Sequence, residues 1–356
     1  MSGSQKTRNP VPIHPPGPSL CRPGFRLPRR ARLLAGALAA ALLGVPAAPA
    51  VAAGCGAVCL PLEALTPQNS QVRGHQLRLS LIGQYADFNH YREGTDSIPN
   101  PGEAHAIISQ LTAAADYGFT RRFTASLLVP YVRKHQSTKK FGDRVAQGVG
   151  DVAMFGRYAV RLPRRLHAPT ISLGLGVKFP TGSTDQPSDK PALPPAMQVG
   201  SGAYDLLPTV SYYQRFKGYD LYGSALYRVP LQSHNGYKFG RELQLHFGTR
   251  VPLDAAGGRF ALLGSLSYTT EQHDQDNNGI LPPKLHNGTE VINTGGRFLD
   301  FTPGVTVALT RTVSLQARFT IPLYQDWNGD RAKGIGQVAQ DLTTQVTLIY
   351  TGDSRL

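Results

Sequence analysis

The residues of this chain that could do chemistry are mostly charged side chains set singly within short apolar stretches. In the stretch 312–324, Arg318 shares every second position with Ser314 and Gln316. A charge that shares one side of an extended segment with hydroxyl and amide groups suits a polar, water-facing wall. The same placement is predicted for ten residues: Arg78, Asp116, Asp151, Arg157, Lys178, Arg228, Glu242, His246, Arg250 and Arg318.

Two explanations fit this charged set. Six of the ten are Arg or Lys and three are Asp or Glu, with His246 uncommitted. Rings of basic side chains in a narrow passage select anions, and Arg157, Arg228 and Arg318 lie toward the middle of their segments. The structural alternative is that charges of both signs pair with each other and with water and so hold the shape of an interior. The sequence leaves both explanations open.

Two cysteines, Cys55 and Cys59, lie in the segment GCGAVCLP, which follows a predicted export leader. In an oxidising periplasm, a disulfide across this short loop is the simplest explanation. A lipid on Cys55 is an alternative, because residues 52–55 weakly resemble a lipoprotein cleavage site. A soft metal such as copper is another, but no His or Met lies within ten residues of the pair. We therefore expect no metal site and no cofactor.

The histidines lack the setting of a catalytic site. A phospholipase site in a membrane β-barrel needs Ser and His together on the outward face near the rim. His246 shares its side with Gln244 and Arg250, which predicts an inward orientation. His234 and His273 fall in connections, and no G-x-S-x-G motif is present. The sequence predicts that the chain is not an enzyme.

One acidic connection resembles the start of a calcium-binding loop. Asp274, Asp276, Asn278 and Gly279 have the spacing of an EF-hand opening. Leu285 stands where the closing bidentate Glu would be required. Connections rich in Asp, Asn and Gly are ordinary turns, which is the interpretation we favour.

The elements that must position the charged set are β-strands. In 312–324, Val313, Leu315, Ala317, Phe319, Ile321 and Leu323 occupy the positions between the polar residues. Only a strand, with period two, sends these two sets to opposite faces. The pattern recurs in twelve segments: 75–88, 104–117, 122–134, 150–161, 169–180, 203–216, 219–231, 239–251, 259–270, 297–309, 312–324 and 340–351.

Connection lengths alternate between these segments. The odd-numbered connections are mostly long and polar, such as 89–101 and 271–296, whereas the even-numbered ones are short, such as 217–218 and 310–311. Outer-membrane barrels have long extracellular loops and short periplasmic turns in this alternation. The predicted fold is therefore an all-β, closed antiparallel transmembrane β-barrel of about 12 strands.

The N-terminal region reads as an export signal. Residues 29–32 supply basic side chains before the apolar run 33–45, and small residues follow. We expect a signal peptide with an extended basic region over 1–53, a periplasmic segment over 54–74, the barrel over 75–351 and a short tail over 352–356. Cys21 would leave with the leader. The expected location is the outer membrane of a Gram-negative bacterium.

The positive charge of the chain does not indicate a nucleic-acid-binding protein. The formal net charge is +14, but residues 1–53 hold seven Lys and Arg and no acidic residue. The remainder therefore has 30 basic and 23 acidic side chains, a net charge of +7. No basic cluster interleaved with aromatic residues remains, so nucleic acid is excluded as an expected partner.

Three segments resemble a known family. They are Gln147–Tyr158 (QGVGDVAMFGRY), Gly174–Asp185 (GLGVKFPTGSTD) and Gly200–Tyr212 (GSGAYDLLPTVSY). They are similar to the barrel family named for the meta-cleavage pathway of phenol degradation, whose members are described as outer-membrane transporters. The resemblance covers residues 77 to 350. It implies a barrel channel and uptake of aromatic or other hydrophobic compounds, and it supplies no binding residues.

Three functional hypotheses follow. The leading one is a passive outer-membrane channel for a small aromatic or anionic solute. The second is a structural or assembly partner with a closed barrel, which docks a periplasmic protein through the Cys55/Cys59 segment. The third is a lipid-acting enzyme. Expected partners are outer-membrane lipid, the solute and the barrel assembly machinery, which would read Tyr350 in the last strand.

Overall fold

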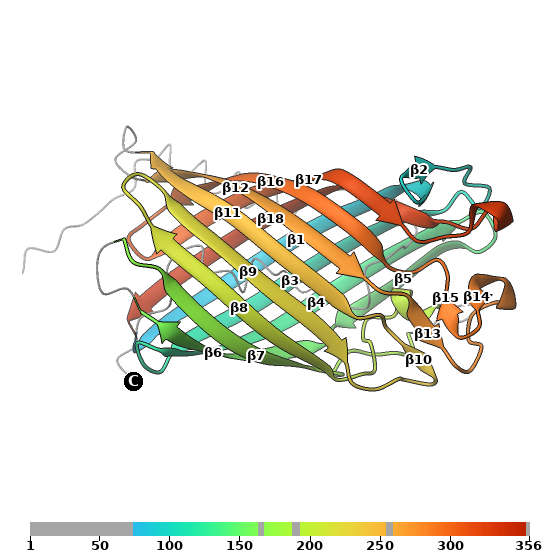
Figure 1. Ribbon diagram of the computed structural model, residues 1–356, viewed down its shortest axis with the longest axis horizontal. Helices are drawn as coiled ribbons and strands as arrows, with labels where there is room; N and C mark the ends of the chain where they lie inside the picture. The colour runs from blue at the N-terminus through green and yellow to red at the C-terminus, as the bar shows by residue number, and fades with distance from the viewer. Residues whose placement is uncertain (1–73, 163–166, 187–192, 254–258, 354–356) are drawn as a thin grey trace, which may run out of the picture. The chain divides into compact units, whose positions relative to one another are not determined.

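The protein, as a computed structural model, forms a closed antiparallel β-barrel (Figure 1). The structure describes residues 74–162, 167–186, 193–253 and 259–353. The twelve barrel strands are β1 (Gln76–Glu93), β3 (His105–Gly118), β4 (Phe123–Thr138), β6 (Val152–Arg161), β7 (Thr170–Phe179), β8 (Asp205–Arg215), β9 (Asp220–Pro230), β11 (Glu242–Leu253), β12 (Phe260–Glu271), β16 (Gly296–Ala308), β17 (Val313–Trp327) and β18 (Gln337–Asp353).

Each barrel strand pairs with the next one along the chain, and the first pairs with the last. β1 and β18 are antiparallel from Gln76 opposite Asp353 to Arg92 opposite Gln337. This pairing removes both open edges, as a strand-built membrane span requires. The predicted number, order and direction of the strands are confirmed.

The strands form where apolar and polar residues alternate in the sequence. The exposure of the side chains of β17 shows the reason. Phe319 and Leu323 are 48% and 57% exposed, whereas Gln316 and Arg318 are 3% and 1% exposed. The outward residues have no protein to pack against, so their exposure is favourable only in contact with hydrocarbon. The parity predicted from the sequence for this strand is confirmed from Val313 to Leu323.

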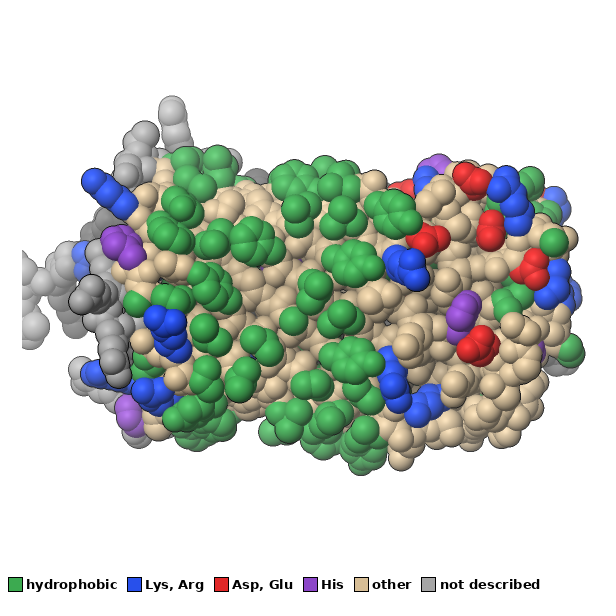
Figure 2. All heavy atoms as spheres, viewed as in Figure 1, with side chains coloured by type: hydrophobic (Ala, Val, Ile, Leu, Met, Phe, Trp, Pro, Cys, Tyr) green, Lys and Arg blue, Asp and Glu red, His purple; other side chains and the backbone are tan. Residues whose placement is uncertain are grey.

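Exposed or partly exposed apolar side chains come from every barrel strand and form a broad band on the face seen in Figure 2, which we call the belt. Tyr350 lies opposite Val313 near one end of β17, and Tyr324 lies eleven residues further along that strand. At about 3.3 Å per residue and a tilt of roughly 40°, these levels are about 28 Å apart. This distance matches the hydrocarbon thickness that a membrane barrel must span.

The two ends of the barrel differ. One end has short connections, such as 216–219 and 309–312. The other end has long connections with extra short elements (Figure 1). These elements are β2 (Asp96–Ser97), β5 (Gly142–Val149), β10 (Tyr237–Lys238), β13 (Asp274–Asp276), β14 (His286–Asn287), β15 (Glu290–Val291) and the 3-10 turns η1 (Pro195–Met197), η3 (Pro283–Leu285) and η4 (Arg331–Lys333). We call these the turn end and the loop end. No helix within the described ranges is long and apolar enough to cross a membrane.

Several strands continue further toward the loop end than the sequence predicts. β1 reaches Glu93 rather than residue 88, and β4 reaches Thr138 because it pairs there with β5 in a hairpin. β18 begins at Gln337 rather than residue 340 because it pairs with the extended β1. Outside the hydrocarbon these extensions need no apolar face, so alternation does not mark their ends.

The interior contains apolar residues that strict alternation does not predict. Ile82, Leu128, Phe155, Leu207 and Leu226 are buried together inside the barrel. They come from β1, β4, β6, β8 and β9, so side chains from well-separated parts of the wall meet there. Each follows another apolar residue in the sequence, as in Leu127-Leu128. Two adjacent apolar residues in a strand indicate that both faces of the strand are in apolar surroundings. In this barrel, one face contacts hydrocarbon and the other contacts the apolar cluster inside.

Candidate functional site

The barrel interior holds all the charged residues expected to face inward, and it organises them into separate networks. The first network lies toward the turn end. Asp116 on β3 accepts from Arg78 Nε of β1 at 2.9 Å and from Arg157 Nη2 of β6 at 2.8 Å. Ser126 of β4 donates to the same carboxylate. Arg78 lies directly opposite Asp116 in the β1–β3 ladder, so strand register produces the pair.

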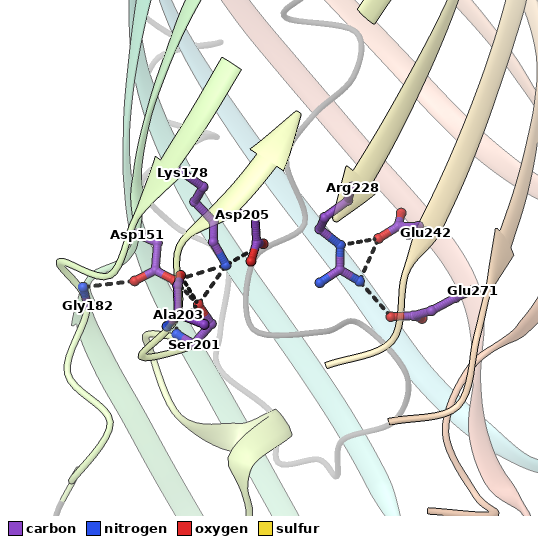
Figure 3. A network of polar contacts seen from close by, with 9 residues as sticks. All are labelled: Asp151, Lys178, Gly182, Ser201, Ala203, Asp205, Arg228, Glu242 and Glu271. Carbon is purple, nitrogen blue, oxygen red and sulfur yellow. Dashed lines mark hydrogen bonds and ion pairs between the residues drawn. The ribbon is translucent and has the colours of Figure 1, made fainter. Parts of the chain in front are cut away.

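The second network is centred on Lys178 of β7 (Figure 3). Lys178 Nζ lies 2.7 Å from Asp205 Oδ2 and 3.2 Å from Asp151 Oδ2, and all three side chains are almost completely buried. It also donates to Ser201 Oγ at 2.6 Å. Two carboxylates thus share one ammonium group. The cost of burying these three charges is offset because each charge has a partner of opposite sign.

Asp151 also holds the connection between β7 and β8. Its Oδ1 accepts from the backbone N–H of Gly182 at 3.0 Å, and its Oδ2 accepts from the N–H and the hydroxyl of Ser201. Lys134 of β4 donates to the carbonyl of Ala196 at 2.8 Å. These bonds attach the connection to the inner wall at several points.

The described part of this connection packs inside the loop end of the barrel. Leu193, Met197 and Val199 are buried in one apolar cluster with inward residues of the wall, among them Phe88 and Val132. Buried backbone N–H and C=O groups need hydrogen-bond partners. Asp151 and Lys134 supply partners for this segment, so it can lie inside the barrel. The sequence predicted one of the long polar connections between the segments 169–180 and 203–216. The structure corrects this prediction, because part of the connection packs inside the barrel; we call this part the inserted segment.

The third network lies beside the second (Figure 3). Arg228 of β9 donates from Nε to Glu242 Oε2 at 2.9 Å and from Nη2 to Glu271 Oε1 at 2.8 Å. Arg228 lies opposite Glu242, and Glu242 lies opposite Glu271, in adjacent ladders. The basic excess of the predicted inward set is therefore offset by Asp205 and Glu271, two acidic residues missing from that set.

A layer of large polar side chains crosses the interior at β9, β11 and β17. Arg318 donates to Gln316 Oε1 at 3.1 Å and to the hydroxyl of Tyr222 at 3.4 Å. The ring of His246 stacks on Tyr222, with centroids 5.8 Å apart, and its Nδ1 lies 2.9 Å from Ser267 Oγ. Tyr222 and Arg318 are among the most deeply buried side chains described. We call Tyr222, His246, Gln316 and Arg318 the crossing layer.

Two glycines, on strands next to β9 and β17, leave space for the side chains of Tyr222 and Arg318. A Cβ at Gly248 would be 2.6 Å from Tyr222 Cζ, and a Cβ at Gly304 would be 2.8 Å from Arg318 Cγ. Both distances are too short for any side chain without displacement of the neighbour. Tyr222 was not predicted as an interior residue, although its parity with Arg228 on the same strand marks it as inward.

Arg250 is the last of the predicted set, and it lies near the turn end. Its Nη1 is 3.3 Å from Asp220 Oδ2, and Arg215 approaches the other oxygen of the same carboxylate at 3.1 Å. The geometry thus gives every predicted charged residue a protein partner. A role of these residues in ion selectivity stays a prediction. Cys55 and Cys59 lie outside the described residues.

The acidic connection after β12 contains the short strands β13, β14 and β15, which pair with one another and with β10. The carboxylate of Asp276 accepts from the N–H groups of Asn278 and Leu281 and lies 3.1 Å from His286 Nε2. Burial alone would raise the pKa of Asp276, but these hydrogen bonds hold that pKa below its ordinary value. Asp274 accepts from Tyr237 and Gly240. Both carboxylates are thus occupied by the protein.

The barrel is similar in fold to solved outer-membrane structures. The COG4313 outer membrane channel from Pseudomonas putida F1 has a TM-score of 0.60 and 14% identity, over 79% of this chain and 97% of that chain. The NanC porin has a TM-score of 0.41 and 11% identity, over 76% and 98%. The CymD monoaromatic hydrocarbon channel has a TM-score of 0.38 and 8% identity, over 80% and 90%. No protein-family model and no curated protein matches the sequence.

Proposed function

We propose that this protein is a passive channel for small solutes in the outer membrane of a Gram-negative bacterium. The observation that carries the proposal is a closed twelve-stranded barrel with an apolar outer belt and an inner wall of polar side chains. A wall that is polar on the inside of a membrane span is favourable only where it meets water, solute or other polar groups. The fold similarity to the COG4313 outer membrane channel supports the same conclusion.

The interior suits solutes of small cross-section. Two apolar clusters and the inserted segment occupy interior space beside β3 to β9, and the crossing layer extends from β9 to β17. On the wall formed by β1 and β11 to β18, inward polar side chains remain partly exposed, namely Gln84, Gln244, Ser267, Thr320 and Thr343. We infer that solute passes along this polar wall, between neutral hydroxyl and amide groups. The sequence resemblance implies an aromatic or other hydrophobic solute.

The proposal is tested by conductance. Purified protein, refolded in detergent and shown to be folded by different gel migration before and after boiling, is added to a planar lipid bilayer. We expect discrete current steps of low conductance in 1 M KCl. Protein boiled before addition serves as the control. Folded, heat-modifiable protein that inserts without any current would contradict the proposal.

A second candidate function has one observation in its favour. The crossing layer and the inserted segment are compatible with a barrel that is closed by its own side chains and acts as a structural or assembly partner. This function predicts no conductance together with binding of a periplasmic protein through the Cys55/Cys59 segment. Pull-down with the wild-type chain and with Cys55→Ser/Cys59→Ser distinguishes it from the channel.

A further inference from the structure

One inward carboxylate differs from all the charged groups described above. Asp300 lies on β16 in line with Thr302 and Thr306, on the inner face of the barrel. It is partly exposed, and within the described part of the chain it forms no hydrogen bond and no ion pair. Each of the inward charges named above has a protein partner. Asp300 is therefore an inward carboxyl group that no described side chain pairs with.

The neighbours of Asp300 are neutral. In the ladders it lies opposite Ser267 of β12 and opposite Pro322 of β17. Thr302, two positions along the strand, is bonded through its hydroxyl to that of Thr320 at 3.0 Å. These side chains offer hydroxyl oxygens next to the carboxylate, and directly opposed residues have Cβ atoms about 4.5–5.5 Å apart. Together they present acceptor oxygens from three strands to the interior.

The backbone is irregular at this position. Leu299 pairs with Tyr324, but Asp300 pairs with Pro322, so Leu323 is an extra residue on β17. Such a bulge redirects side chains and is common next to functional sites. A carboxylate without a partner inside a membrane protein opposes folding, so an ionisable group kept there indicates a site for a solute or an ion.

Asp300 lies on the route inferred for solute. It is four residues nearer the loop end of β16 than Gly304, on which Arg318 of the crossing layer lies. Ser267 and Thr320, its neutral neighbours, belong to the partly exposed polar wall. A solute that enters from the loop end along this wall would meet the carboxylate before it reaches the crossing layer.

We propose that Asp300 is a cation-accepting site of the passage and that it favours a solute with a protonated amine over an anion of the same size. The proposal rests on the channel function and specifies its selectivity. An ammonium group carries three N–H donors and a positive charge, which suit one carboxylate flanked by hydroxyl oxygens. The Arg and Lys residues expected to select anions are engaged by protein partners, whereas the charge of Asp300 is available to solute.

The test compares wild type with Asp300→Asn in planar bilayers. We expect a cation-favouring reversal potential for wild type in a KCl gradient, and a shift toward zero for D300N. Benzylammonium chloride should reduce the potassium current of wild type, whereas potassium benzoate, an anion of the same size, should have little effect. The benzylammonium concentration that halves the current should rise about tenfold in D300N, since a charge-assisted contact is lost.

Two further variants control the experiment. Asp143→Asn removes one exposed negative charge at the β4–β5 hairpin and should leave both readouts unchanged. Asp300→Glu retains the charge and should retain cation preference. An anion-favouring wild type, or an equal shift in D300N and D143N, would overturn the assignment of Asp300. Absence of current from folded wild type would overturn the channel function itself, so the two failures are distinguishable.

Discussion

Replacement of Lys178 by Met should strongly destabilise the barrel. Lys178 Nζ is 2.7 Å from Asp205 and 3.2 Å from Asp151, and all three side chains are at most 2% exposed. At an effective dielectric constant of about 20, each contact corresponds to about 5–6 kcal/mol of Coulomb energy, much of which offsets the cost of burial. Removal of the cation leaves two buried carboxylates without a positive partner. We expect the unfolding free energy to fall by about 3–5 kcal/mol.

The measurement is reversible unfolding in guanidinium chloride with the protein in lipid vesicles. Lys139→Met is the matched control, because Lys139 makes a short contact with Glu103 in which both side chains are about two-thirds exposed. An exposed pair is worth about 0–1 kcal/mol. Adding Asp205→Asn to Lys178→Met should restore part of the loss, since Asp151 keeps its bonds to Gly182 and Ser201. Equal losses for K178M and K139M would refute the reasoning.

Two other predictions concern the crossing layer and the outer belt. Gly248→Ala should displace Tyr222 and cost about 1–3 kcal/mol of unfolding free energy, with a change in single-channel conductance. Gly264→Ala, where the nearest side-chain atom is 3.9 Å away, should change neither quantity. Phe319→Arg, near the middle of the belt, should cost about 2–4 kcal/mol, and Leu315→Arg, nearer its edge, about 0–1 kcal/mol. Ser314→Arg on the inward face is the control for folded yield, and equal yields for S314R and F319R would contradict the orientation of β17.

The barrel itself was predictable because one physical rule governs every strand. A side chain that contacts hydrocarbon must be apolar. Because successive residues of a strand point to opposite faces, every second residue of a spanning strand is therefore apolar. The expected segment 312–324 therefore differs from β17 (Val313–Trp327) by one residue at its turn end and by three at its loop end. Beyond Leu323, the bulge shifts the parity, and Gln325 and Trp327 are both buried.

The interior was predictable in composition but not in arrangement. Arg78, Asp116 and Arg157 were all expected to face inward, but their shared contact depends on strand register, which a single sequence does not supply. Asp300 could have been found, because the stretch FLDFTPGVTV alternates and places it in line with Thr302. The inserted segment at Met197 could not, since it depends on contacts between residues far apart in the chain.

The seam between β1 and β18 determines how the chain can fold. Its partners, such as Gln76 and Asp353, are separated by nearly the whole described sequence, whereas the other ladders join strands that follow one another. The seam is thus the slowest contact to form. The conformational entropy of the longest loop must be lost before any hydrogen bond of the seam can form and offset that loss. Until then, β1 and β18 each present an unpaired edge. The open sheet is consequently the state in which the protein is most prone to aggregation, and it persists until the last strand is in place.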